Sequence, residues 1–233
     1  MTGWWVSANR RNACSFAGAP ETLQDDYIVF AMAARGVNEE GAPAKLQEFL
    51  RLALKHNPVN VGNGIKGGVY RASQNLNPLA HWRRTDHLDF KAIVEGIDSC
   101  TSAAAVFDTR ANCEAFLVEL KQADLGVSVN VSALADTAHA CCKQAGITRH
   151  SVGYSLGFHG DLHLLPERPV LELSTMCGHG MVSHNFARKM MDWVKEGRRD
   201  PTQAATYMAR FCSCGVFNPT RAARILEEVR EGR

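Results

Sequence analysis

Apolar residues along this chain fall into two patterns, short continuous runs and stripes with helical spacing. The run YIVFAMA at 27–33 contains β-branched and aromatic residues between polar flanks, which predicts a buried strand. The segment APAKLQEFLRLALK at 42–55 repeats apolar residues at i, i+3 and i+4 and has Pro43 in its first turn, which predicts an amphipathic helix. A second strand is expected at 59–61.

The second half of the chain continues this alternation, and it sets the predicted fold class. Strands separated by helices of 10–15 residues are typical of βαβ units. We therefore expect an α/β fold with a mixed, mostly parallel sheet, flanking helices and a C-terminal three-helix segment. The chain is expected to form a single domain at 1–233, with two lobes at 1–100 and 101–233 as the alternative. The predicted elements are strands at 103–107, 126–131, 150–156 and 169–175, and helices at 110–122, 134–145, 179–195, 201–210 and 219–230.

The connection between the last two predicted strands bears on the position of one candidate site. Residues 158–168 lack helical periodicity, which favours an antiparallel pairing of 150–156 with 169–175. That pairing would bring Arg149 and His150 close to Cys177.

The segment STMCGHGMVSH at 174–184 carries the first candidate chemistry. Cys177 is expected at a corner between a strand and a helix, where Gly178 and Gly180 allow the backbone to turn. Unpaired N–H groups at the start of the next helix would stabilise a thiolate there. His179 is the nearest proton carrier.

A second cysteine motif follows the predicted helix at 201–210. Cys212 and Cys214 form a C-x-C-G sequence, and together with Cys177 they supply three thiols on loops at helix ends. Two coordination schemes fit three thiolates and a histidine, a closed Cys₃His zinc site and a 4Fe-4S iron–sulfur cluster with one open iron.

The cluster scheme predicts an enzyme. An open iron is a Lewis acid that can polarise a hydroxyl or carboxylate oxygen, which indicates a lyase of hydro-lyase type acting on a small carboxylate. In this hypothesis His179 or His150 moves protons, and Arg221 or Arg149 holds the substrate carboxylate.

Two other functions remain open at this level. The residues MCGHG at 176–180 resemble the cysteine motif of the proline racemase family, a resemblance that implies metal-free acid/base chemistry by Cys177 on the α-carbon of an amino acid. The chain lacks the family's second motif, D-x-x-P-C-G-T-G. The other alternative is a non-catalytic module in which the same residues bind zinc or sense redox state.

Composition narrows the class of partner. A net charge of +2 gives no basic surface of the kind that binds nucleic acid, and no apolar run reaches the ~18 residues of a membrane span. We expect a cytoplasmic protein with a small-molecule substrate, as a homo-oligomer or with a partner subunit. The glycine-rich segment at 62–68 contains G-x-G-x-x-G but no amphipathic helix after it, so it predicts a flap over a pocket in preference to a nucleotide site.

Overall fold

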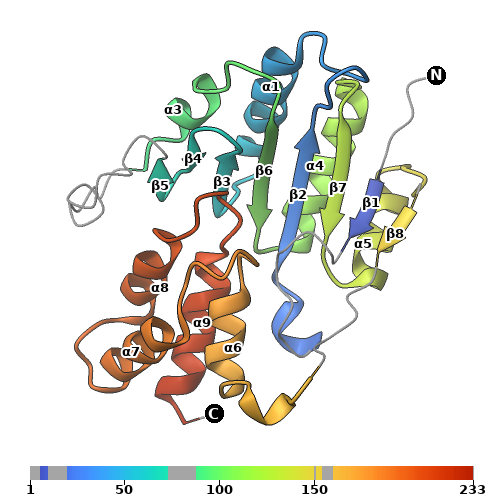
Figure 1. Cartoon of the computed structure of the whole chain (residues 1–233). Helices are drawn as coiled ribbons and strands as arrows, with labels where there is room; N and C mark the ends of the chain where they lie inside the picture. The colour runs from blue at the N-terminus through green and yellow to red at the C-terminus, as the bar shows by residue number, and fades with distance from the viewer. Residues whose placement is uncertain (1–5, 10–19, 73–87, 150, 154–159, 233) are drawn as a thin grey trace.

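A computed structural model describes residues 6–9, 20–72, 88–149, 151–153 and 160–232, which build one eight-stranded sheet with helices on both faces (Figure 1). The order of the strands across the sheet is β5-β4-β3-β6-β2-β7-β1-β8. The strands are β1 (Val6–Asn9), β2 (Tyr27–Met32), β3 (Asn60–Asn63), β4 (Gly67–Gly68), β5 (Arg71–Ala72), β6 (Ser102–Phe107), β7 (Ser128–Ser132) and β8 (Ser151–Gly153). The α-helices are α1 (Ala42–Leu54), α3 (Phe90–Glu95), α4 (Arg110–Ala123), α5 (Ala135–Gln144), α6 (Arg168–Thr175), α7 (His184–Lys195), α8 (Pro201–Ala209) and α9 (Pro219–Arg230), with 3₁₀ turns η1 (Pro20–Leu23) and η3 (Leu162–Leu164).

The prediction of a mostly parallel sheet is wrong. Across the sheet from β5 to β7, every pair of neighbouring strands is antiparallel. Strands β2 and β3, joined through α1, both run antiparallel to β6, which lies between them. Likewise β6 and β7, joined through α4, flank β2. In each βαβ unit, the two strands are therefore separated by one strand of the other βαβ unit. This is the strand order of the ferredoxin-like topology. Parallel pairing is confined, among the described strands, to β1 with β7 and β8.

The central strands are buried on both faces, and each face packs against its own set of helices. Along β2, Tyr27, Val29 and Ala31 belong to the core formed with α1, α4 and α5, whereas Ile28 belongs to the core formed with α6 to α9. Because successive side chains on a strand point to opposite faces, a continuous apolar run is what a doubly covered strand requires. The four C-terminal helices gather in one group at the lower part of the molecule in Figure 1.

The predicted strand at 169–175 is also wrong, since these residues form α6. Val170 and Leu173 are buried three residues apart, and Arg168 pairs with Glu172 at the i,i+4 spacing of a helix. The sequence V-L-E-L at 170–173 resembles a strand because polar and apolar residues alternate within it. The buried residues, however, have helical spacing. The antiparallel pairing that was to bring Arg149 and His150 to Cys177 therefore does not exist, and β8 pairs with β1 instead.

The other predicted elements have counterparts with shifted ends. The helix expected from residue 179 begins at His184, where Ser183 caps it by accepting a hydrogen bond from the backbone N–H of Phe186 at 3.2 Å. The described part of the chain has no helix whose length and apolar character would suffice to cross a membrane.

A buried ion-pair network joins the sheet to the C-terminal helices. The Arg221 side chain is 0% exposed, and its guanidinium lies 3.0 Å from an oxygen of Asp26 and 3.2 Å from an oxygen of Glu172. Asn218 caps α9 and donates from its side chain to the Asp25 carbonyl and to the Asp26 carboxylate. These contacts fix the start of α9 against the beginning of β2 and against α6.

Replacing Arg221 should destabilise the fold strongly. Arg221→Met leaves the Asp26 and Glu172 carboxylates without their shared cation in a dry environment, which should lower the free energy of unfolding by about 3 kcal/mol. Urea denaturation measures this change. Arg230→Met, an exposed position on the same helix, is the matched control and should cost less than about 1 kcal/mol. Equal losses in the two variants would contradict a structural role for the network.

The buried thiol of Cys142 makes stability fall at alkaline pH. Burial on α5 raises the pKa of this thiol from 9.0 to about 11, so between these values the unfolded chain loses a proton that the folded chain keeps. Stability should therefore drop as pH rises from 9 towards 11, by at most about 1.4 kcal/mol per pH unit from this group. Urea titrations at pH 8 and 10 measure the change. Cys142→Ala should show a smaller loss, and an unchanged pH dependence would refute the assignment.

Candidate functional site

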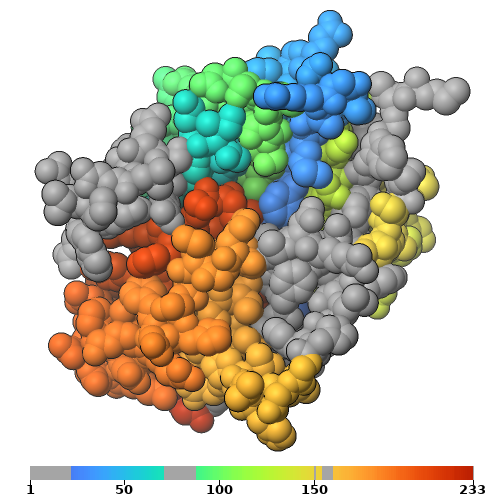
Figure 2. Space-filling view, in the orientation of Figure 1, coloured from blue at the N-terminus to red at the C-terminus, as the bar shows by residue number. Residues whose placement is uncertain are grey.

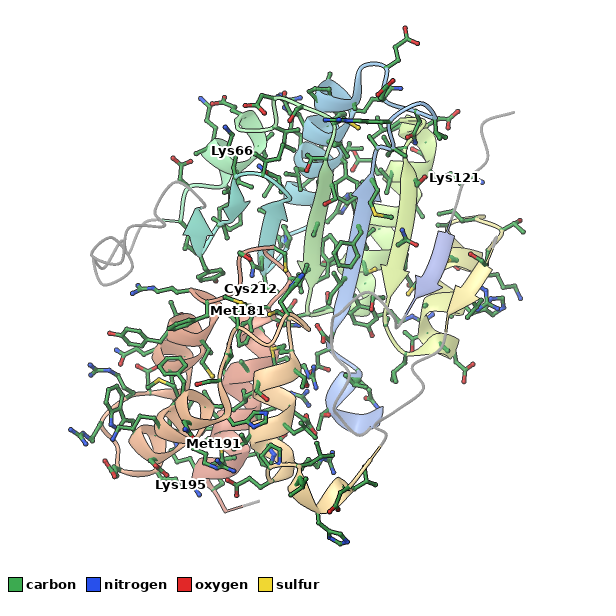
Figure 3. The ribbon with its side chains drawn as sticks, viewed as in Figure 1. Lys66, Lys121, Met181, Met191, Lys195 and Cys212 are labelled. Atoms are coloured by element: carbon green, nitrogen blue, oxygen red, sulfur yellow. The ribbon has the colours of Figure 1, made fainter. Side chains whose placement is uncertain are left out.

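Two loops among the C-terminal helices bring the sulfur atoms together. Cys177 follows α6, and Cys212 and Cys214 lie in the loop between α8 and α9. Cys177 and Cys212 are each 1% exposed, Cys214 is half-buried and His179 is exposed. Figure 3 shows Cys212 where the C-terminal helices meet the sheet, with Met181 from the other loop labelled nearby.

The four side chains form a continuous line of contacts. A hydrogen bond joins Cys177 to Cys212, and the Cys212 and Cys214 sulfur atoms are 3.5 Å apart. The Cys214 sulfur lies 3.4 Å from Nδ1 of His179. The line therefore starts at two buried thiols and ends at an exposed imidazole. Tertiary structure thus brings together residues that lie more than thirty positions apart in the sequence.

Cys212 is the member of this line whose surroundings favour the thiolate form. Hydrogen bonds from the Cys177 and Cys214 thiols, and then from the backbone N–H groups of Phe217 and Val216, hold its pKa well below the usual 9.0 despite burial. Both backbone nitrogens lie 3.3 Å from the sulfur. Hydrogen bonds to the charged form of a group are a recognised cause of a lowered pKa. These contacts therefore favour a negative charge on a buried sulfur atom.

The stabilised thiolate is at a different motif from the one that we expected. The segment at 174–184 was to place Cys177 before a helix, but Cys177 follows the C-terminus of α6, and α7 starts only at His184. The donors at Val216 and Phe217 were not predictable from the sequence, because almost every residue type carries a backbone N–H group.

The glycine-rich segment at 62–68 supports the Cys212–Gly215 loop. A Cβ atom at Gly62 would lie 2.8 Å from Cα of Gly215, and one at Gly68 would lie 2.7 Å from the same atom. Gly215 itself has a φ of +70° and faces the Val61 carbonyl. Close approach of two backbones requires glycine. In Figure 2 the red C-terminal part lies directly against the teal β3–β4 hairpin.

This packing corrects the expected flap. Gly62 and Gly68 are paired in the β3–β4 ladder, so the segment is part of the sheet. It acts as a rigid backing for the thiol loop. Asn60 adds a hydrogen bond of 2.8 Å from its side chain to the Phe217 carbonyl, which holds the loop from the other end. The sequence signal was available in the repeated glycines, but their partner segment lies about 150 residues further on.

The arginines and the second histidine of the predicted site lie elsewhere. Arg221 is buried in the ion-pair network, with its guanidinium bound to two carboxylates of the protein. Arg149 lies near Cys142, which belongs to the core on the opposite face of the sheet from Cys177. His150 falls outside the described residues.

Neither the geometry of possible metal ligands nor a comparison with known proteins identifies the function of this site directly. Within the described residues, no group of three or more His, Cys, Asp and Glu side chains already surrounds a common point that could hold a metal ion. The three thiols and His179 form a line of contacts. No known family model, curated protein or solved structure matches the chain.

Adding a methyl group at Gly62 should displace the thiol loop. Gly62→Ala places a Cβ in contact with Gly215, and overpacking of this kind costs about 1–3 kcal/mol. The displaced loop should expose Cys212, so its alkylation by iodoacetamide, followed by mass spectrometry, should be at least tenfold faster.

Gly197→Ala is the control for a general loss of stability. Gly197 has a φ of +69° and nothing within 4 Å of the added carbon, so only backbone strain of about 1 kcal/mol is expected. An equal increase in Cys212 alkylation in both variants would show that the hairpin does not specifically hold the loop.

Proposed function

We propose that this chain binds one divalent transition-metal ion, best zinc, through Cys177, Cys212 and Cys214, with His179 as the fourth ligand. The observation that carries the proposal is the geometry around the buried Cys212 sulfur, which accepts hydrogen bonds from two backbone N–H groups and lies 3.5 Å from the Cys214 sulfur, itself 3.4 Å from Nδ1 of His179. Thiolates and imidazole are the ligands that zinc prefers.

The surroundings of Cys212 suit a ligand of a cation, because they favour the thiolate form that binds metal ions. Cys212 is 1% exposed, and hydrogen bonds from thiols and backbone amides lower its pKa. A bound metal ion would neutralise the thiolate and would release the protons of Cys177 and Cys214.

The separations fit a single ion better than a cluster. In a tetrahedral zinc site the sulfur atoms are about 3.8 Å apart and sulfur and nitrogen about 3.6 Å apart, given metal–ligand bonds of about 2.3 and 2.1 Å. The observed values are 3.5 Å for Cys212–Cys214 and 3.4 Å for Cys214–His179. Thiolates on separate irons of a 4Fe-4S cluster are roughly 6 Å apart. Metal binding then requires the outer two side chains to turn inward and close the line around the ion.

The position of the arginines supports a binding module in preference to a carboxylate lyase. Arg221 was to hold the substrate, but its guanidinium already binds Asp26 and Glu172 and is 0% exposed. A racemase would need its thiol in contact with the substrate, whereas Cys177 is 1% exposed. A metal-binding or metal-sensing role needs neither feature.

Metal analysis of the purified protein tests this proposal. We expect about one zinc per chain after purification under reducing conditions, and tetrahedral d–d and sulfur-to-metal bands when cobalt(II) replaces zinc. Cys212→Ser should weaken cobalt binding at least 100-fold, because a ligand loss should exceed the 10–100-fold effect of losing a residue that only orients a ligand.

Cys100→Ser is the matched control. Its half-buried thiol donates to the Ala33 carbonyl at 3.2 Å, a bond that serine can also make, so cobalt binding should be unchanged. A brown protein containing sulfide would overturn the single-ion proposal in favour of a cluster. A metal-free protein that binds no cobalt and instead forms a Cys212–Cys214 disulfide would favour redox sensing.

A further inference from the structure

Basic and aromatic side chains alternate on α7, on α8 and in the loop between them, at the lower left of Figure 1. The Lys189 ammonium lies 5.5 Å from the centroid of the Trp193 ring. The Arg199 guanidinium lies 5.7 Å from that ring and 5.8 Å from the ring of Tyr207. The Arg210 guanidinium in turn lies 5.2 Å from the Tyr207 ring. All four separations are cation–π distances, and we call these five side chains the cation–aromatic row.

The three cations of this row are not neutralised by the fold. Within the described part of the chain, no ion pair joins Lys189, Arg199 or Arg210 to a carboxylate. Two other arginines of the same segment, Arg188 and Arg198, each form such a pair. Arg199 donates to the carbonyl oxygen of Arg198 at 3.0 Å, but its Nε–H group has no acceptor among the described residues. The row therefore offers uncompensated positive charge to a partner.

The net charge of the whole chain does not show this local excess. Residues 184–210 contain six Lys and Arg against three Asp and Glu, a balance of +3, whereas the whole chain has +2. Of the three acids, Glu196 pairs with Arg198, Asp200 caps α8, and Asp192 is exposed on α7. The net charge led us to expect no surface for nucleic acid, but a binding surface depends on the local distribution of charge.

We infer that the cation–aromatic row is a binding site for single-stranded nucleic acid, whose phosphate groups its cations contact. An arginine stacked on an aromatic ring can still donate to phosphate oxygens from the edge of its planar guanidinium. Proteins that bind single strands combine such cations with aromatic rings on which bases stack. Phe211, the residue after Arg210, is 37% exposed and has its ring centroid 4.8 Å from that of Phe186, so it offers a ring for a base. This inference does not depend on a metal ion at the thiols.

Two other anionic partners fit these side chains less well. Peripheral binding to an anionic membrane requires exposed apolar side chains that enter the lipid layer. Among the described residues of α7 and α8, no large apolar side chain is exposed. An acidic protein segment would match the positive charge, but it has no base to stack on Phe211. A single strand supplies both phosphates and bases.

Fluorescence anisotropy with short labelled oligouridine and oligothymidine tests this inference. Both should bind, because neither phosphates nor ring faces distinguish RNA from DNA. With three phosphate contacts, the logarithm of the binding constant should fall with the logarithm of salt concentration at a slope of about −2, so binding should weaken about 15-fold between 50 and 200 mM NaCl.

Substitutions in the row separate the two kinds of contact. Arg199→Gln combined with Arg210→Gln should weaken binding at least tenfold at 50 mM NaCl and reduce the salt slope to about −0.7. Phe211→Leu should weaken binding at least threefold and leave the slope unchanged, because it removes stacking and no charge. Urea denaturation checks that each variant folds, and Phe211→Leu tests the site independently if the double variant does not.

Arg51→Gln combined with Arg110→Gln is the matched control. It removes the same charge from two exposed arginines on α1 and α4, which pack on the other face of the sheet from α7 and α8. This control should bind as the unsubstituted protein does, and an equal loss in both double variants would overturn the row as the site. Failure to bind either oligonucleotide, with or without binding to phosphatidylserine vesicles or polyglutamate, would overturn nucleic acid as the partner.

Discussion

The close backbone contact between the β3–β4 hairpin and the loop before α9 is the constraint on which the rest of this structure depends. Gly62 and Gly68 on the hairpin face Gly215 on the loop, at distances that leave no room for a side chain. The contact joins the edge of the sheet to the C-terminal helices. The contact also fixes the backbone that carries Cys212 and Cys214. The position of these thiols therefore depends on glycine at all three positions, because a Cβ atom at any of them would prevent the close approach.

The same loop is held at its far end by polar contacts. Asn60 donates to the Phe217 carbonyl, and Asn218 donates to Asp26, which also pairs with the buried Arg221. Buried ion pairs contribute little net stability but are expensive to break, so they penalise any alternative docking of α9. Two kinds of interaction, steric on one side and ionic on the other, therefore position the N–H groups of Val216 and Phe217 against the Cys212 sulfur.

Such positioning has a direct chemical consequence. Burial ordinarily keeps a thiol neutral. It acts in this way on Cys142, whose pKa it raises to about 11. Cys212 is equally inaccessible, yet hydrogen-bond donors around its sulfur hold its pKa well below the usual 9.0. Cys142 and Cys212, on opposite faces of the sheet, thus have pKa values shifted in opposite directions although both are buried. The contrast is set by hydrogen-bond donors, and burial alone would not produce it.

Local sequence predicted the central elements well and their pairing poorly. Apolar runs and stripes predicted β2, β6, α1 and α4 to within a few residues, because burial of one face imposes its period on the sequence. The order of the strands could not be predicted from the sequence. A βαβ unit whose two strands are neighbours and one whose strands are separated by a third strand have the same local sequence pattern. The alternation in α6 was misread for a related reason: a segment of eight residues is too short to distinguish the two periods.

The sequence by itself determined the ligand types, three cysteines and a histidine flanked by glycines, and the α/β alternation of the chain. Only the tertiary structure decided that these sulfur atoms lie in contact, that hydrogen-bond donors lower the pKa of Cys212, and that Arg221 is buried in an ion-pair network. Residue type fixes the chemistry that a side chain can perform. Its pKa, its partners and its access to solvent depend on atoms contributed by distant segments, and those are set by packing.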